Sequence, residues 1–305
     1  MSHQTTRRSF SKFKRQPEDN KIVLQKRDLE ILKLVYEYRF IQSDQITALM
    51  EASHDPICRR LQKLFHNGYL DRFVDLRRIR VRTGSDKMAY AITRKTGSLL
   101  ASEAGLDWAK IDWDTKNRKM SEPYIKHTLM ISNFRATLTL ACRAQKNLNI
   151  ESWIENRGTG QNVNKQISDR VWIEGKDGRE KRLPVVPDAF FRLLIDDEED
   201  FLFLEADRGT MSASRFLLKL LAYKAWREQG GFEKKFDHTH FRVLTVAPSN
   251  ERRDSLREAA ESLDRGGMFW FTSEKYYSLD YPESIFQNIW LTGKAKDSKL
   301  HSLIE

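Results

Sequence analysis

The fold of the N-terminal part of the chain is decided by residues 55–68, which read DPICRRLQKLFHNG. Asp55 and Pro56 predict the start of a helix, because proline is pre-set for the first helical position and the aspartate side chain can accept from an open backbone N–H. Asn67 and Gly68 predict its end, since both residues tolerate the left-handed conformation that closes many helices. The stretch therefore predicts a short helix with sharp limits.

One side of this helix is apolar and the other is polar. At about 100° per residue, the apolar side chains that gather on one face are Ile57, Leu61, Leu64 and Phe65. The candidate DNA-binding residues of the helix are Arg59, Arg60, Gln62, Lys63 and His66. A plain solvated face is the alternative interpretation, because charge is common on amphipathic helices.

The neighbouring segments predict a winged helix-turn-helix domain over residues 23–104. The expected elements are a helix from Leu24 to about Arg39, a helix that Ser43 caps, strands at 69–74 and 87–92, and a last helix that Thr93 caps. The turn of the motif falls at 52–55. In this arrangement the helix that starts at Pro56 is the third, and we expect it to read the major groove of double-stranded DNA.

The connection between the two strands is expected to form the wing. It carries four arginines, which are Arg77, Arg78, Arg80 and Arg82, and residues 83–85 form its tip. Only Asp75 and Asp86 lie nearby, so the wing has a concentrated positive charge. We therefore expect it to contact phosphates or the minor groove.

Composition and charge agree with a nucleic-acid partner. Across 305 residues, 53 Lys and Arg exceed 43 Asp and Glu by 10, which favours a polyanionic partner. No apolar stretch approaches the roughly 20 residues that span a bilayer, so we expect no membrane association. The two cysteines lie far apart and predict neither a disulfide framework nor a CxxC metal site, so the cytoplasm is the expected compartment.

The remaining sequence predicts an arm, a linker, a second domain and a tail. Residues 1–22 form a disordered basic arm with Arg7, Arg8, Lys12, Lys14 and Arg15, and residues 105–120 form a polar linker. Residues 121–292 alternate helical and strand patterns, which predicts an α/β domain, and residues 293–305 form a flexible tail. The chain as a whole is therefore expected to be α/β.

Two acidic clusters stand at strand ends of the second domain. Asp188 follows Pro187 at the start of one strand, and Glu205 and Asp207 lie at the end of the next. Carboxylates brought together on adjacent strands suit a divalent cation, which can polarise a phosphate and activate water. The plain alternative is structural and is favoured: Asp188 caps a turn, and Glu205 pairs with Arg208 or Arg215.

The order of elements over 121–292 is similar to that of the restriction-endonuclease-like fold, whose motif reads PD followed by (D/E)xK. Pro187 and Asp188 match the first half and Glu205 matches the acidic residue, but Asp207 stands where that family has its lysine. Lys219, on the next helix, is the candidate replacement. The resemblance implies that Asp188, Glu205 and Asp207 bind Mg²⁺ or Mn²⁺ if the protein is a nuclease, with Lys219 stabilising the phosphate.

The chain resembles the replication-relaxation family over residues 24–260. The matching N-terminal segments are RDLEIL at 27–32, QI at 45–46, RRLQKL at 59–64, NGYL at 67–70, YAIT at 90–93 and Gly97. The matching C-terminal segments are HTL at 127–129, VPDA at 186–189, EADRGT at 205–210, KLLAY at 219–223 and FRVL at 241–244. The resemblance implies a DNA-binding protein of plasmids, phages or other mobile elements.

Two functions follow as hypotheses. The first is sequence-specific binding of double-stranded DNA in replication, mobilisation or transcriptional control, for which the sequence indicates no certain cofactor. Its C-terminal domain forms a homodimer or recruits replication or mobilisation proteins. Under it, Arg59 and Gln62 read base edges, while Lys63 and the wing hold phosphates. The alternative is a metal-dependent DNA nickase or endonuclease that uses the carboxylates around Asp188.

Overall fold

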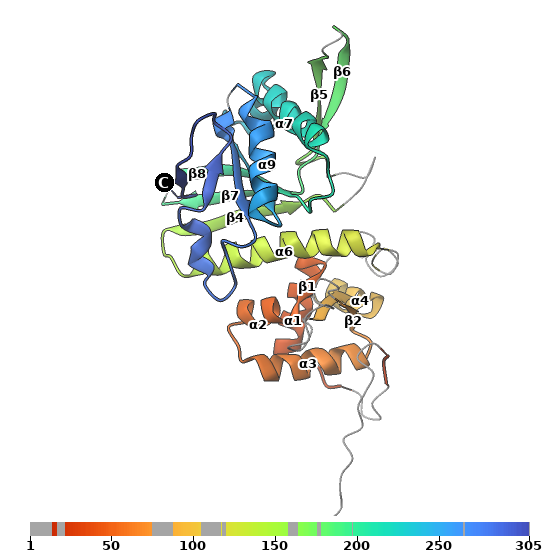
Figure 1. Ribbon diagram of the computed structural model, residues 1–305. Coiled ribbons are helices and arrows are strands. Elements are labelled where there is room, and N and C mark those ends of the chain that lie inside the picture. The colour runs from red at the N-terminus through yellow and green to blue at the C-terminus, as the bar shows by residue number, and fades with distance from the viewer. Residues whose placement is uncertain are drawn as a thin grey trace, which may run out of the picture. The chain divides into compact units, whose positions relative to one another are not determined.

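The computed structural model describes residues 14–16, 22–74, 88–104, 117, 120–157, 164–175, 178–196, 198–264 and 266–304 (Figure 1). The chain divides into two compact units, Met1–Asn133 and Phe134–Glu305, here named the N-terminal and C-terminal units. The division falls inside helix α6 (Glu122–Arg143). Helices and sheets are mixed throughout, which confirms the expected α/β class. None of the helices in the described part is long and apolar enough to cross a membrane.

The N-terminal unit combines helices with a small antiparallel sheet. Its elements are α1 (Lys26–Tyr38), β1 (Ile41–Gln42), α2 (Ser43–Leu49), α3 (His54–His66), β2 (Leu70–Val74), β3 (Met88–Ile92) and α4 (Arg94–Ala104). The three strands pair in the order β1-β3-β2. The connection between β2 and β3, with Arg77, Arg78, Arg80 and Arg82, lies outside the described residues. The winged-helix interpretation therefore stays a prediction.

The limits of the first helices differ slightly from the sequence expectation. Helix α3 begins at His54 rather than at Pro56, and Ser53 occupies the N-cap position. Gln42 rather than Ser43 caps α2, because the Gln45 side chain accepts the backbone N–H of Gln42 at 2.8 Å and forms a capping box. At the other end of α3, Gly68 has a φ of 78°, the left-handed conformation that glycine adopts without a steric penalty.

A continuous apolar core holds the N-terminal unit together. Ile31 and Leu32 of α1, Ile46 of α2 and Leu61 and Leu64 of α3 are all fully buried. Full burial of such a side chain stabilises a fold by roughly 1.5–3 kcal/mol relative to leaving it exposed. The apolar face of α3 is thus committed to packing, which leaves its other face to solvent.

A seven-stranded sheet forms the centre of the C-terminal unit. Its strands are β4 (Leu148–Glu155), β7 (Ala189–Ile195), β8 (Glu198–Ala206), β9 (Arg242–Ala247), β10 (Phe269–Ser273), β11 (Trp290–Thr292) and β12 (Leu300–His301). They are ordered β12-β11-β10-β9-β8-β7-β4. The pairs β8 with β9 and β9 with β10 are parallel, and the other neighbours are antiparallel. Strands β5 (Asp169–Glu174) and β6 (Glu180–Val185) form a separate two-stranded ribbon.

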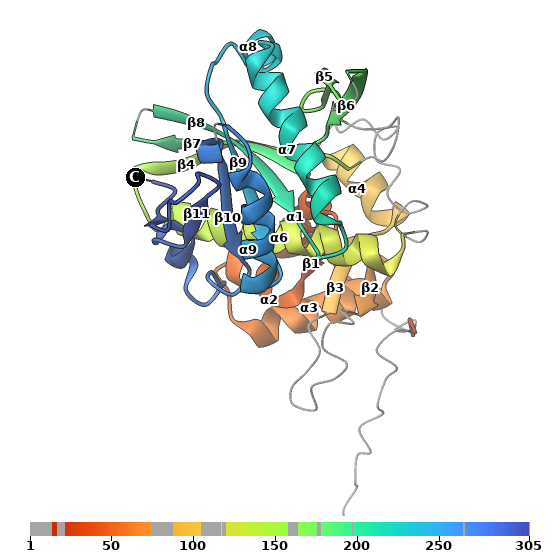
Figure 2. The same ribbon diagram turned by 45° about the horizontal axis from the view of Figure 1, so that its top comes forward.

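Helices cover both faces of this sheet (Figure 2). Phe190 and Phe191 are successive residues of β7 and therefore point to opposite faces. Phe191 packs against Phe134 of α6, whereas Phe190 packs against Phe203 and Phe236 on the other face. The helices on that second face include α7 (Ala213–Glu228), α8 (Gly231–Phe236) and α9 (Asn250–Glu261).

The C-terminal residues differ from the flexible tail expected over 293–305. Strand β12 pairs with β11, and Leu303 is fully buried. Arg242 donates to the backbone oxygen of Leu303 at 2.8 Å. An apolar side chain and a satisfied carbonyl therefore hold this segment in the core, although its sequence is short and polar. Most of the linker expected over 105–120 lies outside the described residues.

Candidate functional site

The exposed side of α3 carries polar side chains along its length, with His54 and Asp55 exposed in the first turn. Arg59, Gln62 and Lys63 are exposed, and we name them the α3 surface. On the opposite side, Ile57 and Leu61 are fully buried. The α3 surface therefore has two cations and one amide on a helix that is fixed from behind, with the exposed Asp55 carboxylate one turn before Arg59.

Arg60 lies on α3 but is not part of the α3 surface, because it contacts another helix. It forms an ion pair with Asp28 of α1, and its Nε donates to Oδ1 of Asp28 at 2.7 Å. Asp28 is fully buried and also accepts the backbone N–H of Gln25 at 2.7 Å, as part of the capping box of α1. The hydrogen bond with Asp28 raises the pKa of Arg60. Arg60 thus joins α3 to α1, which departs from its predicted contact with DNA.

His66 also departs from its predicted place. Its side chain is buried at the C-terminal end of α3, where Nδ1 accepts the backbone N–H of Gln16 at 3.2 Å. Its ring packs edge-on against Phe65, with centroids 5.2 Å apart. The helix is tightly covered at this end, so the imidazole is not part of the α3 surface.

The described part of the basic arm is held against the same end of α3. Arg15 donates to the backbone oxygens of Phe65 and Leu70 at 3.1 and 3.0 Å and forms an ion pair with Asp71. Its guanidinium lies over the Phe65 ring, 5.4 Å from the centroid. A guanidinium has several donors, so one side chain bonds the last turn of α3, strand β2 and a carboxylate at the same time. Residues 1–13 and 17–21 lie outside the described residues.

In the C-terminal unit, Asp188 and Glu205 meet at neighbouring strand ends. The backbone N–H of Asp188 donates to Leu204 at 3.1 Å, and its carboxylate accepts the backbone N–H of Ala206 at 2.8 Å. Glu205 is the penultimate residue of β8 and is 3% exposed. Antiparallel pairing of β7 and β8 accounts for this arrangement.

Helix α7 supplies two partners for Glu205. Lys219 forms an ion pair with Oε2 of Glu205, and the Tyr223 hydroxyl donates to Oε1 at 2.5 Å. Lys219 and Tyr223 are four residues apart, so they share one face of the helix. Burial raises the pKa of Glu205 to about 7, Asp188 adds to the rise, and Lys219 opposes it. The four side chains of Asp188, Glu205, Lys219 and Tyr223 are named the Glu205 cluster.

Asp207 has a different partner, which the sequence did not reveal. Arg252 of α9 binds it with both arms of the guanidinium, Nε to Oδ2 at 2.7 Å and Nη2 to Oδ1 at 3.0 Å. The backbone N–H of Gly209 donates to the same carboxylate at 2.8 Å. Arg252 lies three residues after the N-cap Ser249 and belongs to no motif, so only the packing of α9 shows its role.

These contacts do not fit a divalent cation held by three carboxylates. Both oxygens of Glu205 and both oxygens of Asp207 are engaged by cations or hydroxyl and amide donors. Among the described residues there is no group of three His, Cys, Asp or Glu side chains placed to hold a metal ion. The arrangement is a hydrogen-bonded network of ion pairs, close to the structural alternative, but Glu205 pairs with Lys219 rather than with Arg208 or Arg215.

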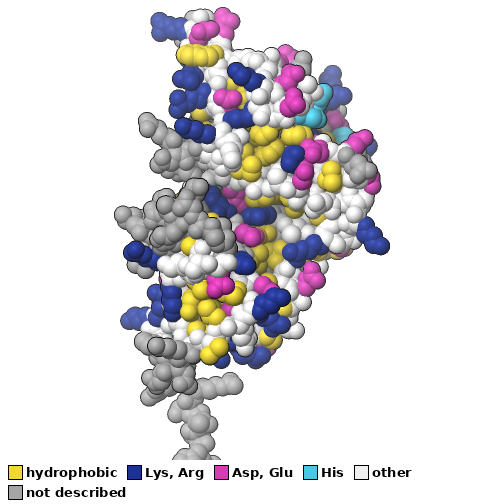
Figure 3. Space-filling view, turned by 180° about the vertical axis from the view of Figure 1, so that it is seen from behind, with side chains coloured by type: hydrophobic (Ala, Val, Ile, Leu, Met, Phe, Trp, Pro, Cys, Tyr) yellow, Lys and Arg dark blue, Asp and Glu magenta, His cyan; other side chains and the backbone are white. Residues whose placement is uncertain are grey.

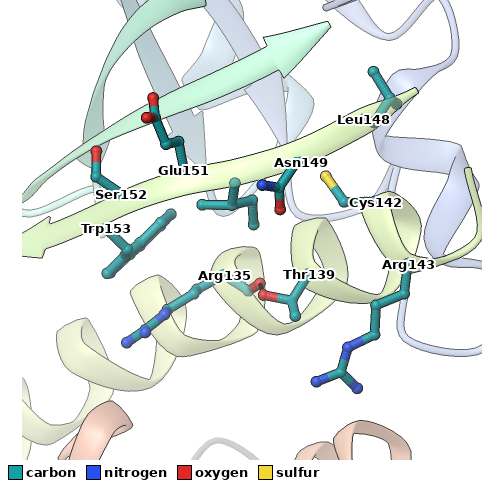
Figure 4. Close-up of a pocket in the computed structure, with 10 residues that line it drawn as sticks. Arg135, Thr139, Cys142, Arg143, Leu148, Asn149, Glu151, Ser152 and Trp153 are labelled. Atoms are coloured by element: carbon teal, nitrogen blue, oxygen red, sulfur yellow. Dashed lines mark hydrogen bonds between the residues drawn. The ribbon is translucent and has the colours of Figure 1, made fainter. Parts of the chain in front are cut away.

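A cavity of about 390 Å³ lies between α6 and β4 in the C-terminal unit. Its polar side chains do not converge on one point: Glu151 and Ser152 point away from α6, and Arg143 extends away from β4 (Figure 4). Arg135 pairs with Glu155 of β4 at 3.4 Å, and its guanidinium lies 5.3 Å from the Trp153 ring centroid. Glu151 instead pairs with Arg192 of β7 at 3.2 Å. Binding sites for small molecules usually combine an apolar cavity with convergent polar groups, so this cavity does not have the features of a catalytic centre.

Comparison with known proteins agrees with the resemblance seen in the sequence. The model of the replication-relaxation family matches residues 32–240, which include α3, the Glu205 cluster and the β5–β6 ribbon. No curated protein and no solved structure matches the chain. The match covers more than half of the 305 residues. The chain therefore belongs to the replication-relaxation family.

Proposed function

We propose that this protein binds double-stranded DNA sequence-specifically through the α3 surface, with the N-terminal unit acting as a winged helix-turn-helix. The family description supports a role in the replication or mobilisation of a mobile element, and control of its genes is part of the same proposal. The second element of support is the basic surplus of 10 charges. Phosphate contacts supply most of the affinity of such proteins, and base contacts supply the specificity.

The observation that carries this proposal is that the polar side chains of α3 have two different environments. Arg59, Gln62 and Lys63 are exposed, whereas the neighbouring Arg60 forms an ion pair with the buried Asp28. An arginine binds the O6 and N7 acceptors of guanine with two donors, and a glutamine binds the N6 and N7 groups of adenine. A helix that is held rigidly from behind presents these groups in a fixed register, which base recognition requires.

The C-terminal unit is proposed to make a homodimer or to recruit replication or mobilisation proteins. A dimer would place two copies of α3 on two half-sites of a palindromic operator. Sedimentation of the full chain, free and with duplex DNA, measures this directly. A monomer in both states would contradict the dimer and leave recruitment of other proteins as the role of this unit.

The test of DNA binding uses the full chain and fluorescently labelled duplexes. Sites selected from a random pool are compared with scrambled duplexes by anisotropy at fixed salt. We expect Arg59→Ala to lower the discrimination between the two by about 1–3 kcal/mol and Lys63→Ala to weaken both equally. Lys33→Ala, an exposed lysine of α1, is the matched control. Binding that is unchanged in Arg59→Ala and Lys63→Ala would disprove the proposal.

A second candidate function, DNA nicking, is favoured by one observation. Lys219 meets Glu205 beside Asp188, and these are the types of side chain that the restriction-endonuclease-like motif brings together. A divalent cation would have to displace Lys219 and Tyr223 from Glu205, or Arg252 from Asp207, before these carboxylates could hold it. Supercoiled plasmid is incubated with the protein and Mg²⁺ or Mn²⁺, next to Asp188→Ala and the exposed control Glu198→Ala. Nicking lost in Asp188→Ala and kept in Glu198→Ala supports this candidate. Absence of nicking, or nicking that persists without Asp188, rejects it.

A further inference from the structure

The β5–β6 ribbon is a two-stranded sheet of its own in the C-terminal unit, and neither DNA binding by α3 nor the Glu205 cluster uses it. It pairs antiparallel with Trp172 opposite Arg182 and Arg170 opposite Pro184, and it belongs to neither edge of the seven-stranded sheet. Figure 1 shows the ribbon beside α7. Its two faces therefore have different surroundings.

The inner face of the ribbon is fixed to α7. Val171 and Val185 are buried in the core that includes Trp226. The indole N–H of Trp226 donates to Asp169 at 2.8 Å, and Gln229 donates to the backbone oxygen of Trp172 at 2.6 Å. These contacts hold both strands at their base, so the outer face has a defined orientation.

The outer face presents an exposed tryptophan beside two cations, with Arg182 directly opposite it on β6 and Arg170 before it on β5. Trp172 is 52% exposed, and the Arg182 guanidinium lies 5.8 Å from its ring centroid. Arg170 is two residues away on the same strand and points to the same face. Within the described part of the chain, neither Arg170 nor Arg182 has an acidic partner. In the space-filling view, Lys and Arg side chains lie beside a hydrophobic patch at this end of the unit (Figure 3).

We infer that Trp172, Arg170 and Arg182 bind single-stranded DNA, with one base stacked on the indole and the two guanidinium groups on the flanking phosphates. Bases of any sequence stack on an aromatic ring, and arginine neutralises phosphate at the same time. Arg170 and Arg182 are diagonal neighbours across the strands, about 7–8 Å apart at their backbones, so both reach one nucleotide and its neighbour.

The distribution of charge along the ribbon favours an anionic occupant near its base. Glu174 and Glu180 lie opposite each other at the far end of the strand pair, and the arginines lie nearer to α7. The exposed Arg179 and Lys181 flank Glu180, so the charges of the far end balance, whereas the outer face near the base carries the two arginines. Asp188 follows β6 by only three residues, so the bound strand would lie close to the Glu205 cluster. This surface is separate from the α3 surface and does not depend on it.

The test measures binding of the full chain to labelled oligo-dT by anisotropy. We expect Trp172→Ala to weaken binding by about tenfold, which corresponds to the loss of one stacked base. Trp172→Phe keeps an aromatic face and should retain most of the affinity. Arg170→Ala with Arg182→Ala should weaken binding and reduce its salt dependence. Tyr281→Ala and Lys294→Ala remove an exposed aromatic and an exposed cation elsewhere and serve as controls.

Two further comparisons separate this inference from duplex binding by α3. The double variant Arg59→Ala, Lys63→Ala should lose duplex binding and keep the Trp172-dependent binding of oligo-dT. Circular dichroism and melting curves verify that each variant is folded. The inference is overturned if the wild-type chain does not bind oligo-dT, if Trp172→Ala binds it like the wild type, or if Trp172→Phe is as weak as Trp172→Ala.

Discussion

Arg60 of α3 and Asp28 of α1 form an ion pair whose carboxylate is completely buried. The pair connects the helix that we propose to contact DNA with the helix behind it. Removal of one member of a buried pair leaves the other charged and without compensation, which costs more than the pair itself contributes. This contact therefore sets the position of the α3 surface as well as the stability of the unit.

We predict that Arg60→Ala lowers the free energy of unfolding by about 3–5 kcal/mol. The physical reason is that Asp28 stays buried without its cation. Urea unfolding followed by circular dichroism measures the change, and Arg59→Ala, an exposed neighbour on the same helix, should change stability by less than about 0.5 kcal/mol. Equal effects of the two variants would contradict a structural role for Arg60. In Asp28→Ala, Arg60→Ala the two losses should not add, because they remove the same interaction.

The salt dependence of duplex binding is expected to report on Lys63. Each phosphate that a cation neutralises contributes about 0.9 to the slope of log K against the logarithm of salt concentration. Lys63→Ala should therefore reduce the magnitude of that slope by about one unit. Titrations at several salt concentrations measure it, with Lys33→Ala as a control. If the slope did not change, Lys63 would make no phosphate contact.

Glu205 is expected to make the free energy of unfolding depend on pH between the ordinary pKa of a glutamate and the pKa of Glu205 in the folded chain. Its folded pKa of about 7 lies above the ordinary value of 4.5, so the folded state binds the proton more tightly than the unfolded chain. The free energy of unfolding should therefore fall as pH rises through this window, by about 1.4 kcal/mol per unit from this group alone, and be lowest above pH 7. Urea unfolding at a series of pH values should show that Glu205→Gln removes this slope. An identical slope in the variant would exclude Glu205 as its source.

The packing of the C-terminal segment predicts an effect of a single leucine. Leu303 is fully buried, so Leu303→Ala should lower the free energy of unfolding by about 2–5 kcal/mol. Leu300, three residues earlier, is 38% exposed, and Leu300→Ala should have a much smaller effect. Thermal melts of both variants make the comparison. Similar melting temperatures for Leu303→Ala and the wild type would contradict the packing of this segment and support the flexible tail that the sequence predicts.

Part of the candidate site follows from local patterns. Lys219 and Tyr223 are four residues apart in a helical pattern, and Asp188 and Glu205 stand at the ends of consecutive strand patterns, so their approach is implied by simple geometry. Arg252 could not be predicted in the same way. It meets Asp207 from a helix that is 45 residues away in the chain, and no spacing rule connects them.

The amino-acid sequence alone determines where α3 ends and which of its faces is apolar, because helix stops and hydrophobic periodicity depend on residues within a few positions of each other. Only the tertiary structure decides that Arg59 faces solvent while Arg60 is bound to Asp28. Successive residues on a helix differ in direction by about 100°, so the position of a neighbouring helix selects which of two identical side chains becomes structural. The same long-range packing buries His66 and Leu303 near the ends of their local segments.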